Sequence, residues 1–387
     1  MAGNGIVRYS RREHEMRQLT LFLLLLAALA APMAAQAKAA EPAADRIDRS
    51  SGGSIANVKV TSENFKEVTY RKKGSARAMK IPAEEVVDVS RSDTPQPLRE
   101  GKSKVLAGDL KGALAPLKLA ARNNTPWVKE YANFYLGEAH SRIGNAEEAV
   151  TAYEAVLAAK PDSRFLPRAR LGIAAAWTAA KQYGKAQGVL SAFVREVDAK
   201  RLHRQHALAA KQLLGRNLDA QGKYAEAGRE YDSVISEAKS LVGRAKGEGE
   251  KARLHLIGLR GQRDKGSSLI REKKYSAASM VFSQMANSRN DPLARAIGVM
   301  GQGEVSLAQG KSDLARVLLS EVSALGFGAE EERPRVLRLL AEAYIDLKSK
   351  GEKGAGKLAQ LYIDDLVRNH AGTEDAQAAR DLQKKLK

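Results

Sequence analysis

The chain contains, at Leu136–Pro161, the stretch LGEAHSRIGNAEEAVTAYEAVLAAKP. Its apolar residues recur at helical spacing on both sides of a turn that begins at Gly144. Gly137, before the turn, leaves room for a second helix to approach closely, and Ala149 and Tyr153, after the turn, fill the space that this glycine leaves. The stretch therefore predicts two helices that pack against each other as a hairpin.

The same pattern occurs six times along the chain. Each copy has a turn, an alanine five residues after the turn begins, a large residue four positions after that alanine, and Gly or Ala seven positions before the turn. The turns begin at Gly108, Gly144, Lys181, Gly222, Lys273 and Gly310. They are 36, 37, 41, 51 and 37 residues apart, against about 34 in an ideal two-helix repeat, and we expect the excess to lie in loops, especially Leu241–Glu250. Six copies in register favour a repeat solenoid over a generic alanine-rich bundle.

The second and fourth copies resemble the tetratricopeptide repeat family. The residues that carry the resemblance are Leu136, Gly137, Ala149, Tyr153 and Pro161 in one copy, and Leu214, Gly215, Tyr224, Ala227 and Tyr231 in the other. The resemblance extends over residues 95–387 and implies a mainly α fold, an α-solenoid of about seven hairpins wound into a right-handed superhelix.

The seventh copy is degenerate and is expected to run from Glu332 to the C-terminus. Its two helices are predicted at Pro334–Leu347 and Lys357–Asn369, with an insertion at Ser349–Gly356 between them. Thr373–Leu386 is predicted as the polar capping helix that the end of a solenoid requires.

The composition agrees with closely packed helices and excludes several kinds of chemical site. Of the 387 residues, 44% are hydrophobic but only 5% are aromatic, so the apolar residues are largely Ala, Leu and Val. Such a composition favours helices that pack on small side chains. The chain has no cysteine, which excludes disulfides, zinc-ribbon sites, thiol nucleophiles and the acylated cysteine of a lipoprotein.

The N-terminus has the pattern of an export signal. An unbroken apolar run at Leu21–Ala31 is followed by a small-residue segment that ends at Ala37, as a signal peptidase requires. We expect a signal peptide at residues 1–37, cleavage after Ala37, and export to the periplasm or the extracellular side of the cell envelope. The alternative is an uncleaved anchor, for which about 20 apolar residues are needed. Whether translation starts at Met1 or at Met16 stays open.

A small β unit is predicted between the signal and the helices. Residues 38–54 read as a flexible linker, and residues 55–92 as an all-β unit of four short strands with turns at Lys72–Ser75 and Pro82–Glu84. A unit of about 40 residues is at the lower limit of independent stability, so we expect it to dock on the first helices or on another chain. The apolar residues that alternate with polar ones in the strands are Val58, Val60, Val68, Tyr70, Met79, Ile81, Val87 and Val89.

The chain carries no motif that points to catalysis. Gly101-Lys102-Ser103 and Gly310-Lys311-Ser312 resemble the end of a phosphate-binding loop but lack the glycine that must precede it. His203 and His206 could share a helix face, yet basic residues surround them and no third metal ligand is near. We therefore expect a protein that is not an enzyme and that has neither a cofactor nor a metal.

In the tetratricopeptide family the first helix of each hairpin lines a concave groove that holds the ligand. The resemblance implies a groove that is rich in arginine, and arginine binds carboxylate or phosphate with two parallel hydrogen bonds. An acidic peptide or envelope polymer in this groove is the functional hypothesis, and a solvated basic face is the alternative. The family's carboxylate-clamp positions are not reproduced. The positions expected in the groove are Tyr131, Phe134, Glu138, Arg142, Arg168, Leu171, Gln212, Arg216, Arg260, Arg263, Arg271, Met300 and Glu304.

The net charge suggests what kind of partner an exported chain would meet. Lys and Arg number 64 against 45 Asp and Glu, a formal charge of +19, and about +17 remains after residues 1–37 are removed. Between Ala199 and Lys274 there are 18 basic and 9 acidic residues. We expect a non-catalytic scaffold for a protein or peptide partner, and no nucleic acid. The alternative is adhesion to an anionic polymer or membrane surface through overall charge. The partner's identity and the oligomeric state stay open.

Overall fold

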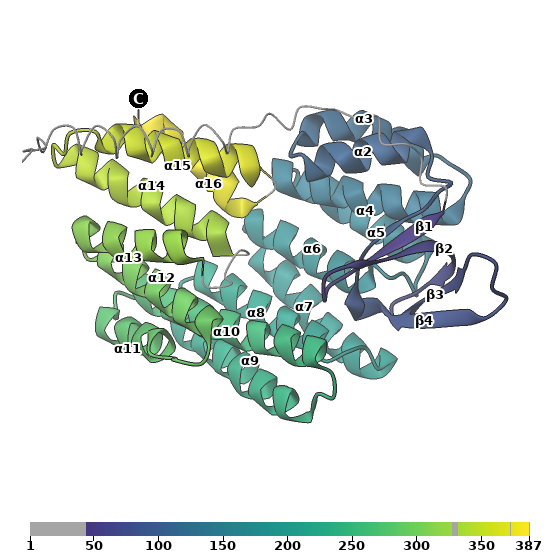
Figure 1. Cartoon of the computed structure of the whole chain (residues 1–387), viewed down its shortest axis with the longest axis horizontal. Coiled ribbons are helices and arrows are strands. Elements are labelled where there is room, and N and C mark those ends of the chain that lie inside the picture. Colours follow the sequence, from purple (N-terminus) through teal and green to yellow (C-terminus); the bar gives the residue numbers. More distant parts are fainter. Residues whose placement is uncertain (1–43, 327–331, 372, 387) are drawn as a thin grey trace, which may run out of the picture. The chain divides into compact units, whose positions relative to one another are not determined.

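The computed structural model describes residues 44–326, 332–371 and 373–386, which form a small sheet followed by a long series of helices (Figure 1). These residues belong to one compact unit, Ala44–Lys387. The predicted signal peptide at residues 1–37 lies outside the described residues. Among the helices in the described ranges, none is both long enough and apolar enough to cross a membrane.

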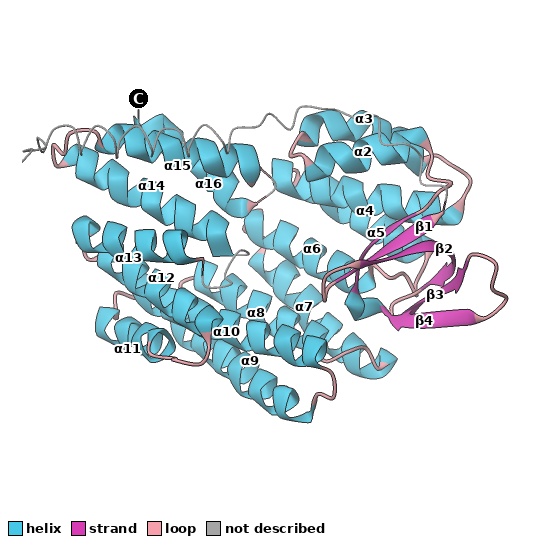
Figure 2. Cartoon of the chain, in the orientation of Figure 1, coloured by secondary structure: helices cyan, strands magenta, loops and turns pink. Residues whose placement is uncertain are grey.

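The sheet has five antiparallel strands in the order β4-β3-β2-β1-β5 (Figure 2). One face carries the buried side chains, among them Ile47, Val58, Val60, Val68 and Tyr70. The predicted hairpin around Lys72–Ser75 is confirmed, because β3 and β4 pair on either side of it. The strands are β1 (Asp45–Arg49), β2 (Ser54–Glu63), β3 (Glu67–Lys72), β4 (Ala78–Pro82) and β5 (Val86–Ser90).

The first strand corrects the predicted linker. β1 lies within residues 38–54 and pairs with both β2 and β5. Its sequence hides the period-two pattern because Ile47 is its only apolar residue. Asp45 is nevertheless fully buried. Its carboxylate accepts hydrogen bonds from the backbone N–H of Val60 at 2.8 Å and of Ser92 at 2.9 Å, which offset the cost of burying its charge.

The second predicted hairpin is wrong. Residues Ala83–Glu85 form a 3₁₀ turn, η1, that carries the chain from one edge of the sheet to the other, so β5 pairs with β1 and not with β4. A register irregularity between β1 and β5 also changes which valine faces the core. Val86 is buried and Val87 is 56% exposed, so the predicted alternation of Val87 with Val89 does not hold.

The helices pack as an α-solenoid, as predicted. Each helix contacts the next one along the chain, and the first helix of each hairpin also contacts the first helix of the following hairpin. The helices are α2 (Gln96–Leu106), α3 (Leu110–Ala121), α4 (Pro126–Ile143), α5 (Ala146–Ala159), α6 (Leu166–Ala179), α7 (Tyr183–Lys200), α8 (Gln205–Ala220), α9 (Tyr224–Arg244), α10 (Glu248–Arg271), α11 (Tyr275–Ala286), α12 (Pro292–Ala308), α13 (Ser312–Leu325), α14 (Arg333–Ser349), α15 (Ala355–Asn369) and α16 (Glu374–Leu386).

The small-to-large contact inferred from the repeats is present inside the hairpins. A Cβ atom placed on Gly215 would lie 2.5 Å from the ring of Tyr231, and one on Gly137 would lie 2.6 Å from the ring of Tyr153. Real Cβ atoms do not approach so closely, so only glycine allows these rings to lie against the first helix. The repeat alanines Ala113, Ala149, Ala186, Ala227, Ala278 and Ala315 are all completely buried.

The longest spacing between repeats comes from helix length, not from a loop. α9 and α10 have 21 and 24 residues and only three residues separate them, so the loop expected at Leu241–Glu250 is wrong. Leu241 and Val242 pack with the buried Leu208 and Leu254. These apolar contacts stabilise the helical conformation of a segment that was expected to be a loop because of its Gly and Lys content.

The sheet docks on the helices through a buried ionic network. The carboxylate of Glu63 accepts hydrogen bonds from the Tyr131 hydroxyl at 2.6 Å, from Nη2 of Arg91 at 2.6 Å and from Nε of Arg164 at 3.0 Å. Nearby, the backbone N–H of Phe65 donates to the carbonyl of Asp162 at 2.9 Å. The expectation that the sheet docks on helices is confirmed, with α4 and the α5–α6 connection as its main support.

Candidate functional site

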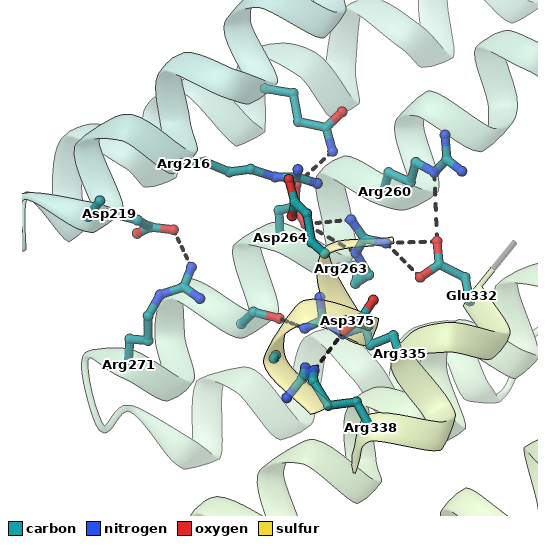
Figure 3. A pocket seen from close by; sticks show the side chains of 15 residues that line it. Arg216, Asp219, Arg260, Arg263, Asp264, Arg271, Glu332, Arg335, Arg338 and Asp375 are labelled. Atoms are coloured by element: carbon teal, nitrogen blue, oxygen red, sulfur yellow. Dashed lines mark hydrogen bonds and ion pairs between the residues drawn. The ribbon is translucent and has the colours of Figure 1, made fainter. Parts of the chain in front are cut away.

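A cavity lies between the first helices of the middle and last repeats. Its volume is about 840 Å³, and its walls come from α8, α10, α14 and the start of α16 (Figure 3). We call it the charged pocket. The residues that line it are Gln212, Arg216, Asp219, Ala220, Arg260, Arg263, Asp264, Ser267, Arg271, Glu332, Arg335, Arg338, Glu374, Asp375 and Ala378.

Asp264 joins α8 to α10 at the centre of the pocket. One of its oxygens accepts hydrogen bonds from Nε of Arg216 at 2.8 Å and from Nε2 of Gln212 at 2.6 Å. The other accepts from Nη2 of Arg263 at 2.9 Å. Burial alone would raise the pKa of Asp264, but Arg216 and Arg263 outweigh it and hold that pKa well below its ordinary value.

Glu332 extends the network toward α14. It makes two hydrogen bonds with Nη1 of Arg263, at 2.7 and 2.6 Å, and lies 3.7 Å from Nε of Arg260. Figure 3 shows Arg260 and Arg263 turned toward this one carboxylate from the same helix. Since Glu332 itself is only 3% exposed, it anchors two arginines while presenting almost no negative surface.

Asp219 anchors the opposite end of the pocket. It forms an ion pair with Arg271 and accepts hydrogen bonds from the hydroxyls of Tyr231 at 2.8 Å and Ser268 at 2.5 Å. Tyr231 is also the large residue of the fourth repeat, so the repeat packing and the pocket share this side chain. The carboxylate is thereby fixed from three directions.

α14 and α16 contribute a second group of charges. Arg335 binds Glu304 at 2.7 Å and the hydroxyl of Ser267 at 2.9 Å. Arg338 donates to Asp375 at 2.7 Å and to Glu342 at 2.5 Å. The capping helix is therefore tied to the pocket through Asp375 at its first turn.

Three of the pocket's ion pairs expose the arginine and cover the carboxylate, whereas the side chains of Arg263 and Arg338 are only 9% and 19% exposed and Glu374 is exposed. The side chains of Arg216 and Arg271 are 42% and 47% exposed, whereas those of their partners Asp264 and Asp219 are 6% and 3% exposed. Arg260 is 33% exposed over Glu332. Each of these three pairs therefore presents mainly a guanidinium group to a ligand, and the acid below it fixes the direction in which that group points.

Comparison with known proteins found likeness at the level of structure only. No protein-family model matches the sequence, and no curated protein matches it. The apo quorum sensor NprR from B. thuringiensis is 15% identical, with a TM-score of 0.43 over 75% of this chain and 86% of that chain. Apo RapI is 11% identical, with a TM-score of 0.45 over 75% and 98%. A tetratricopeptide repeat protein from Parabacteroides merdae is 16% identical, with a TM-score of 0.42 over 75% and 97%.

These TM-scores are too low to carry an argument about function, and the fold rests on the repeat packing described above. The helical part of the chain is a tetratricopeptide-like solenoid. NprR has also been solved in complex with its cognate peptide NprX, which is a property of that protein.

Five of the residues expected in the groove of the tetratricopeptide-like solenoid do line the charged pocket: Gln212, Arg216, Arg260, Arg263 and Arg271. They lie on α8 and α10, the first helices of adjacent hairpins. The spacing of the small residue in each first helix was therefore a sound guide to which face of these two helices points inward.

Three of the other expected groove residues lie in the core, which corrects the prediction. Phe134 and Met300 are completely buried and Tyr131 is 3% exposed. Phe134 stacks on Phe165 with ring centroids 4.2 Å apart, and the Tyr131 hydroxyl binds Glu63. Large apolar side chains on a first helix gain more by packing between helices than by facing water.

The remaining expected positions lie away from the pocket lining. Arg142 donates to the carbonyl of Val105 at 3.1 Å, and Arg168 lies over the ring of Phe134 at 4.4 Å. Glu138 accepts from the hydroxyl of Tyr153. Two further positions complete the set: Leu171 packs in a core cluster and Glu304 binds Arg335.

The carboxylates of the pocket and the arginines of α14 were not predicted. A signal for two of them was present, because Asp219 and Asp264 follow Arg216 and Arg260 by three and four residues and so share a helix face with them. Glu332 and Asp375 carry no such signal, since they come from segments far away in the sequence. Among the described residues, no cluster of His, Cys, Asp or Glu could hold a metal ion.

Proposed function

We propose that the chain is an exported, non-catalytic protein-interaction scaffold, and that its charged pocket binds an extended acidic segment of a partner protein. The observation that carries the proposal is the display of Arg216, Arg260 and Arg271 over nearly buried carboxylates. Guanidinium groups that are fixed in direction and reachable from solvent are suited to binding carboxylates with paired hydrogen bonds.

The shape of the pocket favours a chain segment as the ligand. The arginines are distributed over α8, α10 and α14 and not gathered around one point. Successive acidic side chains of one peptide could meet successive arginines, which a single small anion could not.

The charges of the pocket also favour binding over catalysis. Its lining has six arginines and five carboxylates, most of them in ion pairs. Asp264 keeps a low pKa because Arg216 and Arg263 hold it charged, whereas a general base works best with a pKa near the operating pH. Recognition by fixed charge is therefore the simpler role for these groups.

Export is supported by the sequence of the N-terminus. The apolar run Leu21–Ala31 and the small residues before position 38 have the order of a signal peptide. In an exported chain the acidic segment would belong to a protein of the cell envelope or its surroundings. The position of the mature N-terminus, read by sequencing the secreted protein, tests this part of the proposal.

The pocket is tested by titration with a labelled peptide of repeated glutamate. The double variant R260A/R271A removes two exposed guanidinium groups. It should weaken binding by about tenfold or more, because a hydrogen bond to a charged group contributes about 1.5–3 kcal/mol. Binding should also weaken as salt increases.

The matched control removes two arginines from outside the pocket. R229A/R289A changes two exposed side chains by the same charge and should leave the affinity unchanged. Circular dichroism should show the same helical content in both variants. Equal affinities of the two variants for the peptide, or tighter binding of a lysine peptide, would contradict the proposed role of the pocket.

A further inference from the structure

The turn between β3 and β4 carries an unusual concentration of positive charge. Every residue from Arg71 to Lys80 is exposed, and this segment contains no Asp or Glu. We call its four cations Arg71, Lys72, Lys73 and Arg77 the basic hairpin. Lys80, at its base, binds Glu67 at 2.7 Å. Within residues 44–326, 332–371 and 373–386, no ion pair joins the four cations to a carboxylate.

The basic hairpin has a defined backbone. The N–H of Lys73 donates to the carbonyl of Asn57 at 3.1 Å, and the N–H of Ser75 donates to the carbonyl of Lys72 at 3.0 Å. Gly74 has a φ of 80°, which a side chain would disfavour. Like charges therefore stay close together in a turn that the backbone fixes, although repulsion between them opposes this.

The position of the basic hairpin suits contact with a broad surface. Figure 1 shows the β3–β4 turn projecting at the edge of the sheet, away from the helices. None of its four cations lines the charged pocket. The exposed lysines and arginines of a projecting turn cannot enclose a small ligand or a peptide, but at the tip of the hairpin they can approach a flat anionic surface together.

We propose that the basic hairpin docks the protein on an anionic phospholipid bilayer. The partner surface must be negative and extended, and headgroups with one phosphate charge each meet both conditions. In an exported chain the sheet would also be the first of the described elements to follow the export signal. This docking is independent of the charged pocket, and either activity can fail without the other.

Sedimentation with vesicles tests the proposal. The protein used is the chain from Lys38 onward, which holds the complete compact unit Ala44–Lys387 and lacks the apolar leader. It should sediment with vesicles of phosphatidylcholine mixed with phosphatidylglycerol and not with vesicles of phosphatidylcholine alone. Each cation near the surface contributes about fivefold, so K72A/K73A should weaken binding about twenty-five-fold.

A charge-matched control separates the hairpin from the overall charge. Lys239 and Lys246 are exposed and belong to the helical part, and K239A/K246A should bind vesicles as the unchanged protein does. Equal losses in the two double variants would overturn the proposal in favour of adhesion through net charge. Binding to dextran sulfate without binding to vesicles would overturn it in favour of a soluble polymer.

Discussion

Single side chains determine which groups of the charged pocket face solvent and how they are oriented. Arg216 and Arg271 would each be mobile on an isolated helix, because arginine loses about 2 kcal/mol of side-chain entropy when it is fixed. In the structure Asp264 and Asp219 hold them. The acids are buried under the arginines. Each acid therefore holds its guanidinium group in one orientation while that group remains in contact with solvent.

His206 makes the stability of the protein depend on pH. Burial, together with a smaller effect of the neighbouring His203, lowers the pKa of His206 to about 4, whereas an unfolded histidine has a pKa of about 6.5. Between these two values the unfolded chain binds a proton that the folded chain does not bind. Stability should therefore fall as the pH falls through this window, by about 2 kcal/mol at pH 5 from this residue alone.

The variant His206→Gln cannot take up that proton. Its free energy of unfolding, measured with urea at pH 7 and pH 5, should fall by about 2 kcal/mol less than that of the unchanged protein. His255→Gln is the control, because His255 is 46% exposed beside Asp291. The same acid sensitivity in His206→Gln and in the unchanged protein would refute the assignment.

At the scale of elements, two kinds of packing hold the fold. Within a hairpin, a small residue of the first helix receives a large residue of the second, as Gly215 receives Tyr231. Between the sheet and the helices, the contact depends on the buried charges of Glu63, Arg91 and Arg164. The packing within hairpins repeats along the chain, so it can be predicted from the sequence. The ionic contact between the sheet and the helices occurs once and gives no repeating pattern.

Replacing Glu63 by Gln should detach the sheet from its support. The side chains of Glu63 and Arg164 are each 4% exposed, so Glu63→Gln leaves Arg164 buried without its main counter-charge. Removing one partner of a buried pair costs about 3–5 kcal/mol, which urea unfolding would measure. Asp381→Asn, which breaks an exposed pair with Lys384, should leave the midpoint unchanged. A similarly small effect of Glu63→Gln would show that the network does not hold the sheet.

At the scale of the whole molecule, stability is built from contacts between neighbouring helices. α16 covers the apolar end of the last hairpin, where Leu337, Ile363 and Leu366 are buried. It also places Asp375 in the charged pocket. A Cβ placed on Gly108, in the first hairpin, would lie 2.6 Å from the side chain of Ala371, just before α16. The first and last hairpins therefore touch, which helices in sequence order alone would not require.

Deleting the chain from Glu374 onward should loosen the end of the solenoid first. Hydrogen exchange should become fast in α14 and α15, because their apolar surface loses its cover, while α4–α7 keep their protection. The control K384A/K385A changes exposed residues of α16 and should exchange as the unchanged protein does. Uniform loss of protection along the whole chain would show that the solenoid unfolds as one cooperative unit.

The sequence by itself determined the local and periodic features of this protein. The register of the six repeats, the pairing of Gly215 with Tyr231 and the last hairpin follow from helical spacing and residue size, which act over a few residues. The inward face of α8 and α10 follows from the same spacing, so Arg216, Arg260 and Arg271 could be predicted as pocket residues.

Only the tertiary structure decided what those arginines meet. Glu332 and Asp375 reach the pocket from segments far away in the chain, and no periodic signal marks contacts of that kind. β1 was not predicted for the same reason, because its buried Asp45 is stabilised by hydrogen bonds from the distant residues Val60 and Ser92. Long-range pairing of buried charges depends on where helices and strands lie in the tertiary structure. In this protein it places carboxylates from distant segments beside the arginines of α8 and α10, and the pocket is therefore lined by oriented ion pairs.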